Sequence, residues 1–146
     1  MNHLGTVELE TTRLKLRRFT VEDADNMYKN WASEDEVTRF LTWPTHANVE
    51  VTRELLSTWV KEYENKNYYN WVIELKETKE IVGNISVVSV KEKIEGATLG
   101  YCMGTKWWGK EIMPEAGKVV VKYLFERVGI HRIAAAHDKN NPKSGR

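Results

Sequence analysis

The sequence predicts a mixed α/β fold with a central, mostly antiparallel sheet flanked by helices, and three observations carry this prediction. Three short apolar segments, Trp71–Leu75, Ile81–Val90 and Ala97–Met103, follow one another with charged turns between them, as in an antiparallel meander. Two upstream segments carry apolar residues at the helical spacings of three and four. Downstream, a strand, a helix and another strand follow in order, which favours a right-handed parallel crossover.

The amino-terminal part of the chain predicts a strand and then a helix. Leu14, Leu16 and Phe19 are interleaved with basic residues, which is the pattern of a half-buried strand. Thr20 can cap a helix whose first turn is acidic, and the apolar stripe of that helix would end at Trp31.

The remaining elements are predicted in the same way. A helix is expected from about Val49 to Glu64, after an apolar and aromatic loop at Phe40–His46. A further helix begins near Ile112, and the strand Arg132–Ala136 follows it.

The carboxyl end of the sequence has the pattern of one more helix start. Asn141 can cap it and Pro142 suits its first position, yet the sequence stops at Arg146, within one turn. We therefore expect residues 1–146 to form a single domain that lacks a carboxyl-terminal segment.

Composition and charge argue against several classes of protein. Of 146 residues, 41% are hydrophobic and 29% are charged, which is ordinary for a globular domain, and the net charge is +1. Such a balance does not favour nucleic acid as a partner, and no leader peptide or membrane-length apolar run is present. Cys102 is the only cysteine, which fits a reducing cytoplasm, and the histidines show no metal-ligand spacing. We expect a cytoplasmic protein without a metal or membrane partner.

The segment from Gly100 to Gly117 carries the strongest functional signal. The apolar run Thr98–Met103 enters a polar turn that contains glycine, and helical spacing then begins near Ile112. A strand that leads through a tight loop into a helix is suited to phosphate. The loop amides lack internal partners, and the helix dipole favours an anion.

A triphosphate-binding loop is one interpretation of this segment. The pattern Gly104-x-x-x-x-Gly109-Lys110 matches all but the last position of the P-loop signature. Glu111, however, stands where that signature has the Ser or Thr that binds Mg²⁺, and its carboxylate would face the triphosphate. Too few residues follow to complete a nucleotide-binding sheet, so the sequence disfavours an NTPase.

A second interpretation rests on a resemblance. The segment Lys106-Trp-Trp-Gly-Lys-Glu111 resembles the pyrophosphate loop of the GNAT superfamily of acetyl-CoA-dependent N-acetyltransferases, which reads Gln/Arg-x-x-Gly-x-Gly/Ala. Lys106 replaces Gln or Arg and still offers a donor, whereas Glu111 replaces Gly or Ala with a charge that would repel pyrophosphate. We expect Glu111 to weaken acetyl-CoA binding rather than to abolish it.

The resemblance extends along essentially the whole chain. Residues 9–18 and 22–24 resemble the opening strand and helix of the superfamily, and Val37–Pro44 resembles the segment after the first helix in the ribosomal-protein N-terminal acetyltransferases, the Rim type. The remaining matches, in the order typical of that group, are Trp108-Gly109, Glu115-Ala116, Gly129–Ile133 and Asn141-x-x-Ser144. By this resemblance, the segment missing at the carboxyl end would carry the last strands of the sheet.

The resemblance also implies where acetyl-CoA binds. Strands Thr98–Met103 and Arg132–His137 would splay apart, with the pantetheine arm between them. Its partners there would be backbone groups of Cys102 and Met103. The pyrophosphate would meet the backbone amides of five consecutive residues, Trp108, Gly109, Lys110, Glu111 and Ile112. Asn141 and Ser144 would contact the cofactor from the far side.

The implied reaction is attack of an amine on the thioester, which requires a proton acceptor. Glu74 is one candidate, since a lone carboxylate among apolar strand residues would have a raised pKa, although an outward-facing residue is the plainer interpretation. Tyr101 can orient a water or simply pack in its strand, and Asn141 is the third catalytic candidate. Cys102 is expected to be a small buried hydrophobe rather than a nucleophile.

The sequence as a whole predicts an N-acetyltransferase that acts on a primary amine, first of all a protein N-terminus of the ribosomal-protein-alanine type. Trp43 is the candidate substrate contact, or else an anchor between two helices. A small-molecule amine is the alternative acceptor, and a non-catalytic CoA-binding or interaction module is the alternative function. An uncovered sheet edge would also permit a homodimer.

Overall fold

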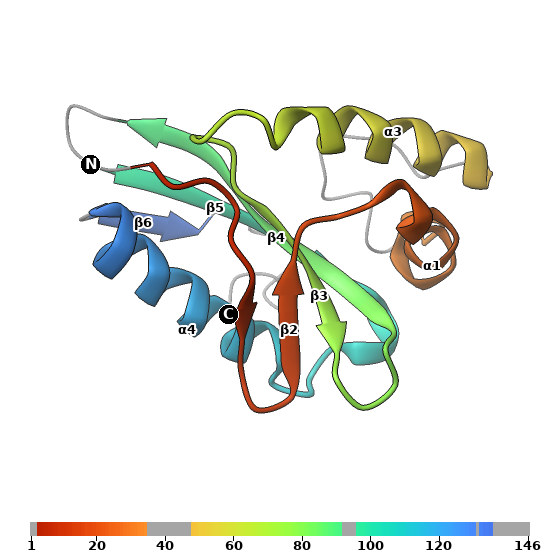
Figure 1. Ribbon diagram of the computed structural model, residues 1–146. Helices are drawn as coiled ribbons and strands as arrows, with labels where there is room; N and C mark the ends of the chain where they lie inside the picture. Colours follow the sequence, from red (N-terminus) through yellow and green to blue (C-terminus); the bar gives the residue numbers. More distant parts are fainter. Residues whose placement is uncertain (1–2, 35–47, 92–95, 131, 136–146) are drawn as a thin grey trace.

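The core of the protein is a six-stranded sheet whose strands lie side by side in chain order. The computed structural model describes residues 3–34, 48–91, 96–130 and 132–135. The strands are β1 (Leu9–Glu10), β2 (Leu14–Arg17), β3 (Asn70–Leu75), β4 (Ile81–Lys91), β5 (Gly96–Met103) and β6 (Arg132–Ala135). All neighbours are antiparallel except β5 and β6, which run parallel (Figure 1). The predicted meander and parallel crossover are therefore confirmed, and only the short strand β1 was not expected.

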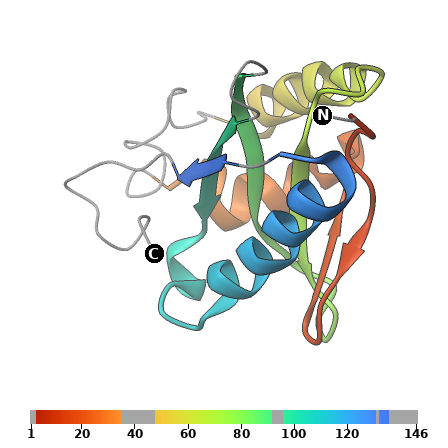
Figure 2. The ribbon, with the colours of Figure 1, turned by 90° about the vertical axis from the view of Figure 1, so that its left-hand side faces the viewer.

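Helices cover both faces of the sheet (Figures 1 and 2). On one face lie α1 (Ala24–Met27), which continues as a wider turn to Ala32, and α3 (Val49–Glu62). On the other face lies α4 (Ile112–Tyr123), which continues as a wider turn to Val128. These are the three predicted helices. In the part of the chain that the structure describes, no helix is long and apolar enough to cross a bilayer.

The two faces of the sheet have separate cores, and alternate residues of one strand divide between them. On β3, Trp71 and Ile73 pack toward α4, whereas Val72 packs toward α1 and α3. The buried residues of α4 are Ile112, Met113, Ala116, Val120 and Tyr123, which confirms the stripe that the spacing predicts. Both helix layers are thus positioned by the period of their apolar residues.

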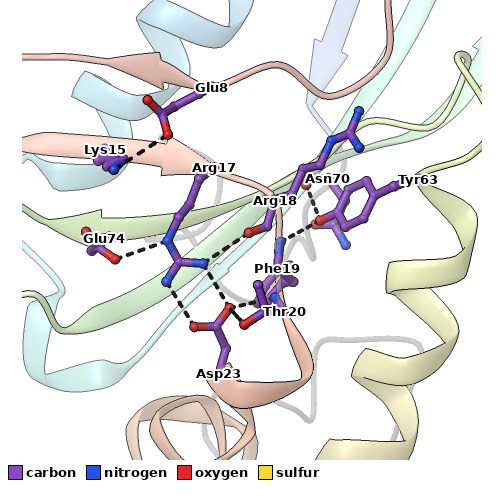
Figure 3. A network of polar contacts seen from close by, with 10 residues as sticks. All are labelled: Glu8, Lys15, Arg17, Arg18, Phe19, Thr20, Asp23, Tyr63, Asn70 and Glu74. Atoms are coloured by element: carbon purple, nitrogen blue, oxygen red, sulfur yellow. Dashed lines mark hydrogen bonds and ion pairs between the residues drawn. The ribbon is translucent and has the colours of Figure 1, made fainter.

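Arg17 ties the start of α1 to the sheet (Figure 3). Its guanidinium donates two hydrogen bonds of 2.9 Å to the carboxylate of Asp23 and one of 3.1 Å to Glu74 on β3. Asp23 also accepts a 2.8 Å hydrogen bond from the backbone N–H of Thr20, at the helix start that the sequence predicts. The hydrogen bonds with Asp23, and then those with Glu74, raise the pKa of Arg17 above its ordinary value although burial opposes them.

Leu56 should be a main determinant of stability, because it is a fully buried leucine by which α3 packs into the core between the sheet and the helices α1 and α3. Replacing Leu56 by Ala should lower the free energy of unfolding by about 2–5 kcal/mol, as measured by urea denaturation. The control is Val51→Ala on the same helix, where the residue is 38% exposed. That change should cost no more than about 0.5 kcal/mol. Similar losses for both variants would contradict the assignment of Leu56 to the core.

Candidate functional site

Strand β5 changes neighbours along its length. Its first half pairs with β6 in parallel register, from Gly96 opposite Arg132 to Leu99 opposite Ala135. Its second half, Gly100–Met103, stays paired with β4 on one side and extends past the described end of β6 on the other. Among the described residues, this half of β5 therefore has a strand on one side only.

The ladder between β4 and β5 determines which main-chain groups face the outer edge. The N–H of Gly104 donates to the carbonyl of Val82 at 2.9 Å. Bonded and non-bonded pairs alternate in an antiparallel ladder, so Cys102 bonds to β4 while the main-chain groups of Tyr101 and Met103 face outward. The ladder thus favours Tyr101 and the N–H of Met103 as the edge available to a ligand, since the carbonyl of Met103 accepts from the indole of Trp108. The backbone of Cys102, which the resemblance implied, faces the other way.

Two tryptophans hold the turn that follows β5. Trp107 is buried, and a Cβ atom at Gly104 would lie 2.8 Å from its ring, so the turn requires glycine there. Trp108 donates its indole N–H to the carbonyl of the last residue of β5 at 2.8 Å. Glu34, just after α1 and its wider turn, accepts hydrogen bonds from the N–H and the hydroxyl of Thr105 at 3.0 and 2.8 Å. These contacts fix the point from which the loop to α4 departs.

Two residues in left-handed conformations shape that loop. Gly109 has a φ of 78°, and Glu111, which immediately precedes α4, has a φ of 62°. Glycine adopts this conformation freely, whereas a residue with a Cβ is strained in it by about 1–2 kcal/mol. The side chain of Glu111 is exposed. The loop therefore tolerates Glu111 at the expense of backbone strain.

The amides of this loop are the strongest candidate for a ligand site. Within the ranges that the structure describes, the backbone N–H groups from Gly109 to Met113 donate to no carbonyl or side chain. The N–H of Trp108 differs, because it donates to the carbonyl of Thr105 at 3.2 Å. Amides without partners at the start of a helix attract an anion. The loop predicted to bind phosphate thus offers amides without an acceptor from Gly109 onward, and phosphate binding there stays a prediction.

Charged side chains of both signs flank these amides. Lys106, Lys110 and Glu111 are all exposed, and the ammonium of Lys106 lies 5.3 Å from the centre of the Trp107 ring. An anion at the loop would thus meet two positive side chains and one negative one.

Arg13 reaches the loop from the opposite end of the chain. It stands just before β2, and its guanidinium donates to the carbonyl oxygens of Lys110 and Glu111, both at 3.3 Å. The same guanidinium forms a 2.8 Å ion pair with Glu115 of α4, to which Thr11 also donates its hydroxyl. Burial opposes the charge of Glu115, but the hydrogen bonds from Thr11 and Arg13 outweigh it and lower the pKa of Glu115. Arg13 and Glu115 together bind the outer side of the loop.

The side chains of Tyr101 and Cys102 lie on opposite faces of β5. Tyr101 is half-buried on the face of α4, and burial raises the pKa of its hydroxyl. Cys102 is buried on the other face, where its S–H donates to Oδ1 of Asn84 at 2.7 Å. Burial raises the pKa of this thiol to about 12. A thiol that stays protonated at neutral pH is a poor nucleophile, which agrees with the prediction for Cys102.

Glu74 does not have the environment that the sequence predicts for a proton acceptor. The expectation of an unpaired carboxylate is wrong, because Glu74 accepts the 3.1 Å hydrogen bond from Arg17 (Figure 3). Its strand, β3, is also separated from β5 by β4. The structure therefore does not bring Glu74 together with the β5 edge.

Three predicted residues, Trp43, Asn141 and Ser144, lie outside the described residues. Among the residues that are described, no group of three or more side chains could hold a metal ion.

Sequence reasoning missed the roles of Arg13, Thr11 and Asn84. Asn84 donates to Asn70 on β3 at 3.0 Å and so continues a buried polar chain from Cys102 across the sheet. Polar residues in the middle of apolar strands were the available signal for this chain. For Arg13 the sequence offered none, because its partners lie at the far end of the chain.

Comparisons with known proteins agree with the resemblance noted in the sequence. The profile described as the acetyltransferase (GNAT) domain matches residues 13–146. The uncharacterized N-acetyltransferase YoaA of Bacillus subtilis is 33% identical over 138 residues, which are 94% of this chain and 77% of that protein. The ribosomal protein uS5 alanine N-acetyltransferase of Escherichia coli is 41% identical over 69 residues, which are 46% of this chain and 35% of that protein.

Solved structures of acetyltransferases have a similar fold. The ribosomal-protein-S5-alanine acetyltransferase of Vibrio fischeri superposes with a TM-score of 0.78 at 22% identity. The match covers 94% of this chain and 78% of that structure.

Removing the charge of Glu115 should reduce the loss of stability in acid. The pKa of Glu115 is lower in the folded protein than the value of about 4.3 of an unfolded glutamate. Its contribution is therefore complete above about pH 4.3 and is lost as the pH falls through the lower, folded value. Melting temperatures measured between about pH 7 and about pH 3 should fall less steeply for Glu115→Gln than for the parent. The exposed Glu126→Gln is the control, and identical slopes for parent and Glu115→Gln would contradict the prediction.

Proposed function

Because the chain belongs to the GNAT acetyltransferase family and is an acetyl-CoA-dependent N-acetyltransferase, we propose that it acetylates the N-terminal amine of a protein, of the ribosomal-protein-alanine type. One observation carries the proposed donor site: among the described residues, the amides from Gly109 to Met113 have no acceptor, and they follow a strand whose second half has no described neighbour on its outer edge.

The donor would occupy two neighbouring parts of this site. Its pyrophosphate would accept hydrogen bonds from the amides of the loop, where the dipole of α4 adds to the attraction. Its pantetheine amides would pair with the outward-facing N–H and C=O of Tyr101, as an added strand does at a sheet edge, because the carbonyl of Met103 already accepts from the indole of Trp108. Both parts lie within a few residues of each other along the chain, so one ligand can span them.

The chemistry would then be direct transfer. The amine nitrogen forms a bond to the carbonyl carbon of the thioester, the carbon–sulfur bond breaks, and the thiolate takes up a proton to leave as CoA. The amine must first lose a proton, and we assign its acceptance to water, because Arg17 already holds Glu74. An outward-facing N–H of β5, such as that of Met103, would stabilise the oxyanion. Tyr101, whose raised pKa keeps its hydroxyl protonated, remains the candidate to orient that water.

The nature of the acceptor is the finer part of this proposal. It is supported by the 69 residues shared at 41% identity with the uS5 alanine N-acetyltransferase, although these are 35% of that protein. A small amine is the second candidate, because the longer match, to YoaA, carries the name of an N-acetyltransferase without an acceptor. Trp43 remains the predicted acceptor contact under either reading. A cytoplasmic location and a homodimer likewise remain predictions, the former supported by the one buried, free cysteine.

Replacing Glu111 by Gly should strengthen donor binding. Glycine removes both the left-handed strain at φ 62° and a negative charge next to the amides. Calorimetric titration with acetyl-CoA should give a dissociation constant in the micromolar range for the parent and one about three- to tenfold lower for Glu111→Gly. Glu126→Gly, at an exposed position remote from the loop, is the matched control. Absence of binding to both the parent and Glu111→Gly would overturn the donor site.

The acceptor can be identified by comparing two amines and one blocked peptide at saturating acetyl-CoA. We expect CoA release with a short peptide that has a free N-terminal alanine. The same peptide with its N-terminus already acetylated should be inactive, and spermidine should be a poor substrate. Mass spectrometry of the product would place the acetyl group on the terminal nitrogen. Turnover of spermidine alone would replace the protein acceptor by a small amine, and turnover of none with intact donor binding would favour a binding module.

A further inference from the structure

The loop that precedes α4 has few contacts of its own that could fix the direction of its amides. Among the described residues, its backbone N–H groups from Gly109 onward have no acceptor, and two of its residues are left-handed. Among the described residues, side-chain contacts to its carbonyl oxygens come from Arg13. The carbonyl of Glu111 also accepts from the N–H of Glu115 at 3.3 Å, so the orientation of the loop depends on the start of α4 together with Arg13, a side chain of the turn between β1 and β2.

Because the peptide bond is planar, a contact that fixes a carbonyl oxygen also fixes the direction of the N–H that follows it. In a trans peptide the C=O and the following N–H point in opposite directions, and the described chain contains no cis peptide. When Arg13 holds the carbonyl of Lys110, the N–H of Glu111 points away from Arg13. When it holds the carbonyl of Glu111, the N–H of Ile112 does the same.

The position of Arg13 is itself fixed on both sides. Its backbone N–H donates to Glu115 at 3.2 Å, and its carbonyl accepts from the N–H of Lys76 at 2.9 Å. Its Nε–H donates to Glu115 at 2.8 Å, which leaves the two terminal nitrogens for the loop carbonyls. A planar guanidinium can serve three acceptors in this way, whereas an ammonium on a flexible stem cannot hold them in one plane.

We propose that Arg13 is a positioning residue for donor binding: clamped by Glu115, it holds the carbonyls of Lys110 and Glu111 so that the amides of Glu111 and Ile112 face the pyrophosphate. This inference rests on the proposed function of the loop. Arg13 itself does not contact the donor. It acts through the peptide units of the loop, from the side opposite to the anion.

Exposure distinguishes this role from a role in folding. The side chains of Arg13 and Glu115 are 47% and 24% exposed. Ion pairs in such positions contribute little to global stability. Loss of the Arg13 side chain should therefore leave the fold intact, but the amides of Glu111 and Ile112 would no longer be held in one orientation. The effect should appear in the affinity for the donor rather than in the melting temperature.

The test uses two acetyl donors that differ in the group recognised by the loop. Acetyl-CoA carries the pyrophosphate, whereas S-acetylpantetheine presents the same thioester and pantetheine without it. In Arg13→Gln, the dissociation constant for acetyl-CoA should rise about tenfold and KM should rise with it, while kcat stays within about twofold. Turnover with S-acetylpantetheine should be the same in variant and parent. Arg13→Lys should lie close to Arg13→Gln, because it keeps the charge and loses the fork.

The control is Arg53→Gln, which removes another exposed arginine that pairs with acidic side chains on α3 and α1, remote from the loop. It should change neither the dissociation constant for acetyl-CoA nor turnover with S-acetylpantetheine. If the parent binds acetyl-CoA and Arg13→Gln binds it equally well, the inference is overturned while the proposed function stands. Equal weakening with both donors would show a general structural defect and would also overturn it. Failure of the parent to bind acetyl-CoA would overturn the proposed function, and this inference with it.

Discussion

The main chain of β5 needs hydrogen-bond partners on both of its edges, and the organisation of the site depends on how that need is met. β4 supplies partners along the whole of one edge, whereas β6, as far as the structure describes it, supplies them from Gly96 to Leu99 on the other. Buried N–H and C=O groups without partners are costly, so the outer edge near Tyr101 and Met103 favours a ligand with amide groups of its own. The loop that we propose to bind the pyrophosphate begins after the next turn, and it would give that ligand a second, charged point of attachment.

The face of the sheet that packs against α1 and α3 combines apolar contacts with a continuous chain of polar side chains. Cys102 on β5 donates to Asn84 on β4, Asn84 donates to Asn70 on β3, and the amide of Asn70 donates to the hydroxyl of Tyr68 at 3.1 Å. A buried polar chain whose members are all paired specifies one arrangement of the strands, because any slip in register would leave its groups without partners. The relative position of β3, β4 and β5, and hence of the donor edge, is fixed on this face.

The helices and the strands other than β1 could be predicted from the sequence because each is specified by a local pattern. The stripe of α4 and the helical turn Val21–Asp23, which Thr20 caps just before α1, are examples in which spacing and capping residues suffice. The glycine-containing turn before α4 was likewise indicated by the sequence, whereas the left-handed conformation of Glu111 was not. What the sequence could not give were the side-chain partners. Glu74 has the pattern of an isolated carboxylate along β3, and only the approach of β2 supplies Arg17. The contacts of Arg13 depend in the same way on the assembled sheet, and no local pattern encodes them.

Arg13 lies far along the chain from the loop that it contacts, and this separation affects the order in which the structure can form during synthesis. Arg13 and Glu115 are separated by 102 residues along the chain, and Arg17 and its partner Glu74 by 57. Contacts of such long range form late in folding, because the loop-closure entropy must be overcome first. During synthesis on the ribosome, the amino-terminal hairpin emerges long before either of its partners. A chain that ends before α4 therefore lacks the contacts that orient this loop, and the proposed donor site can form only after α4 has been synthesised.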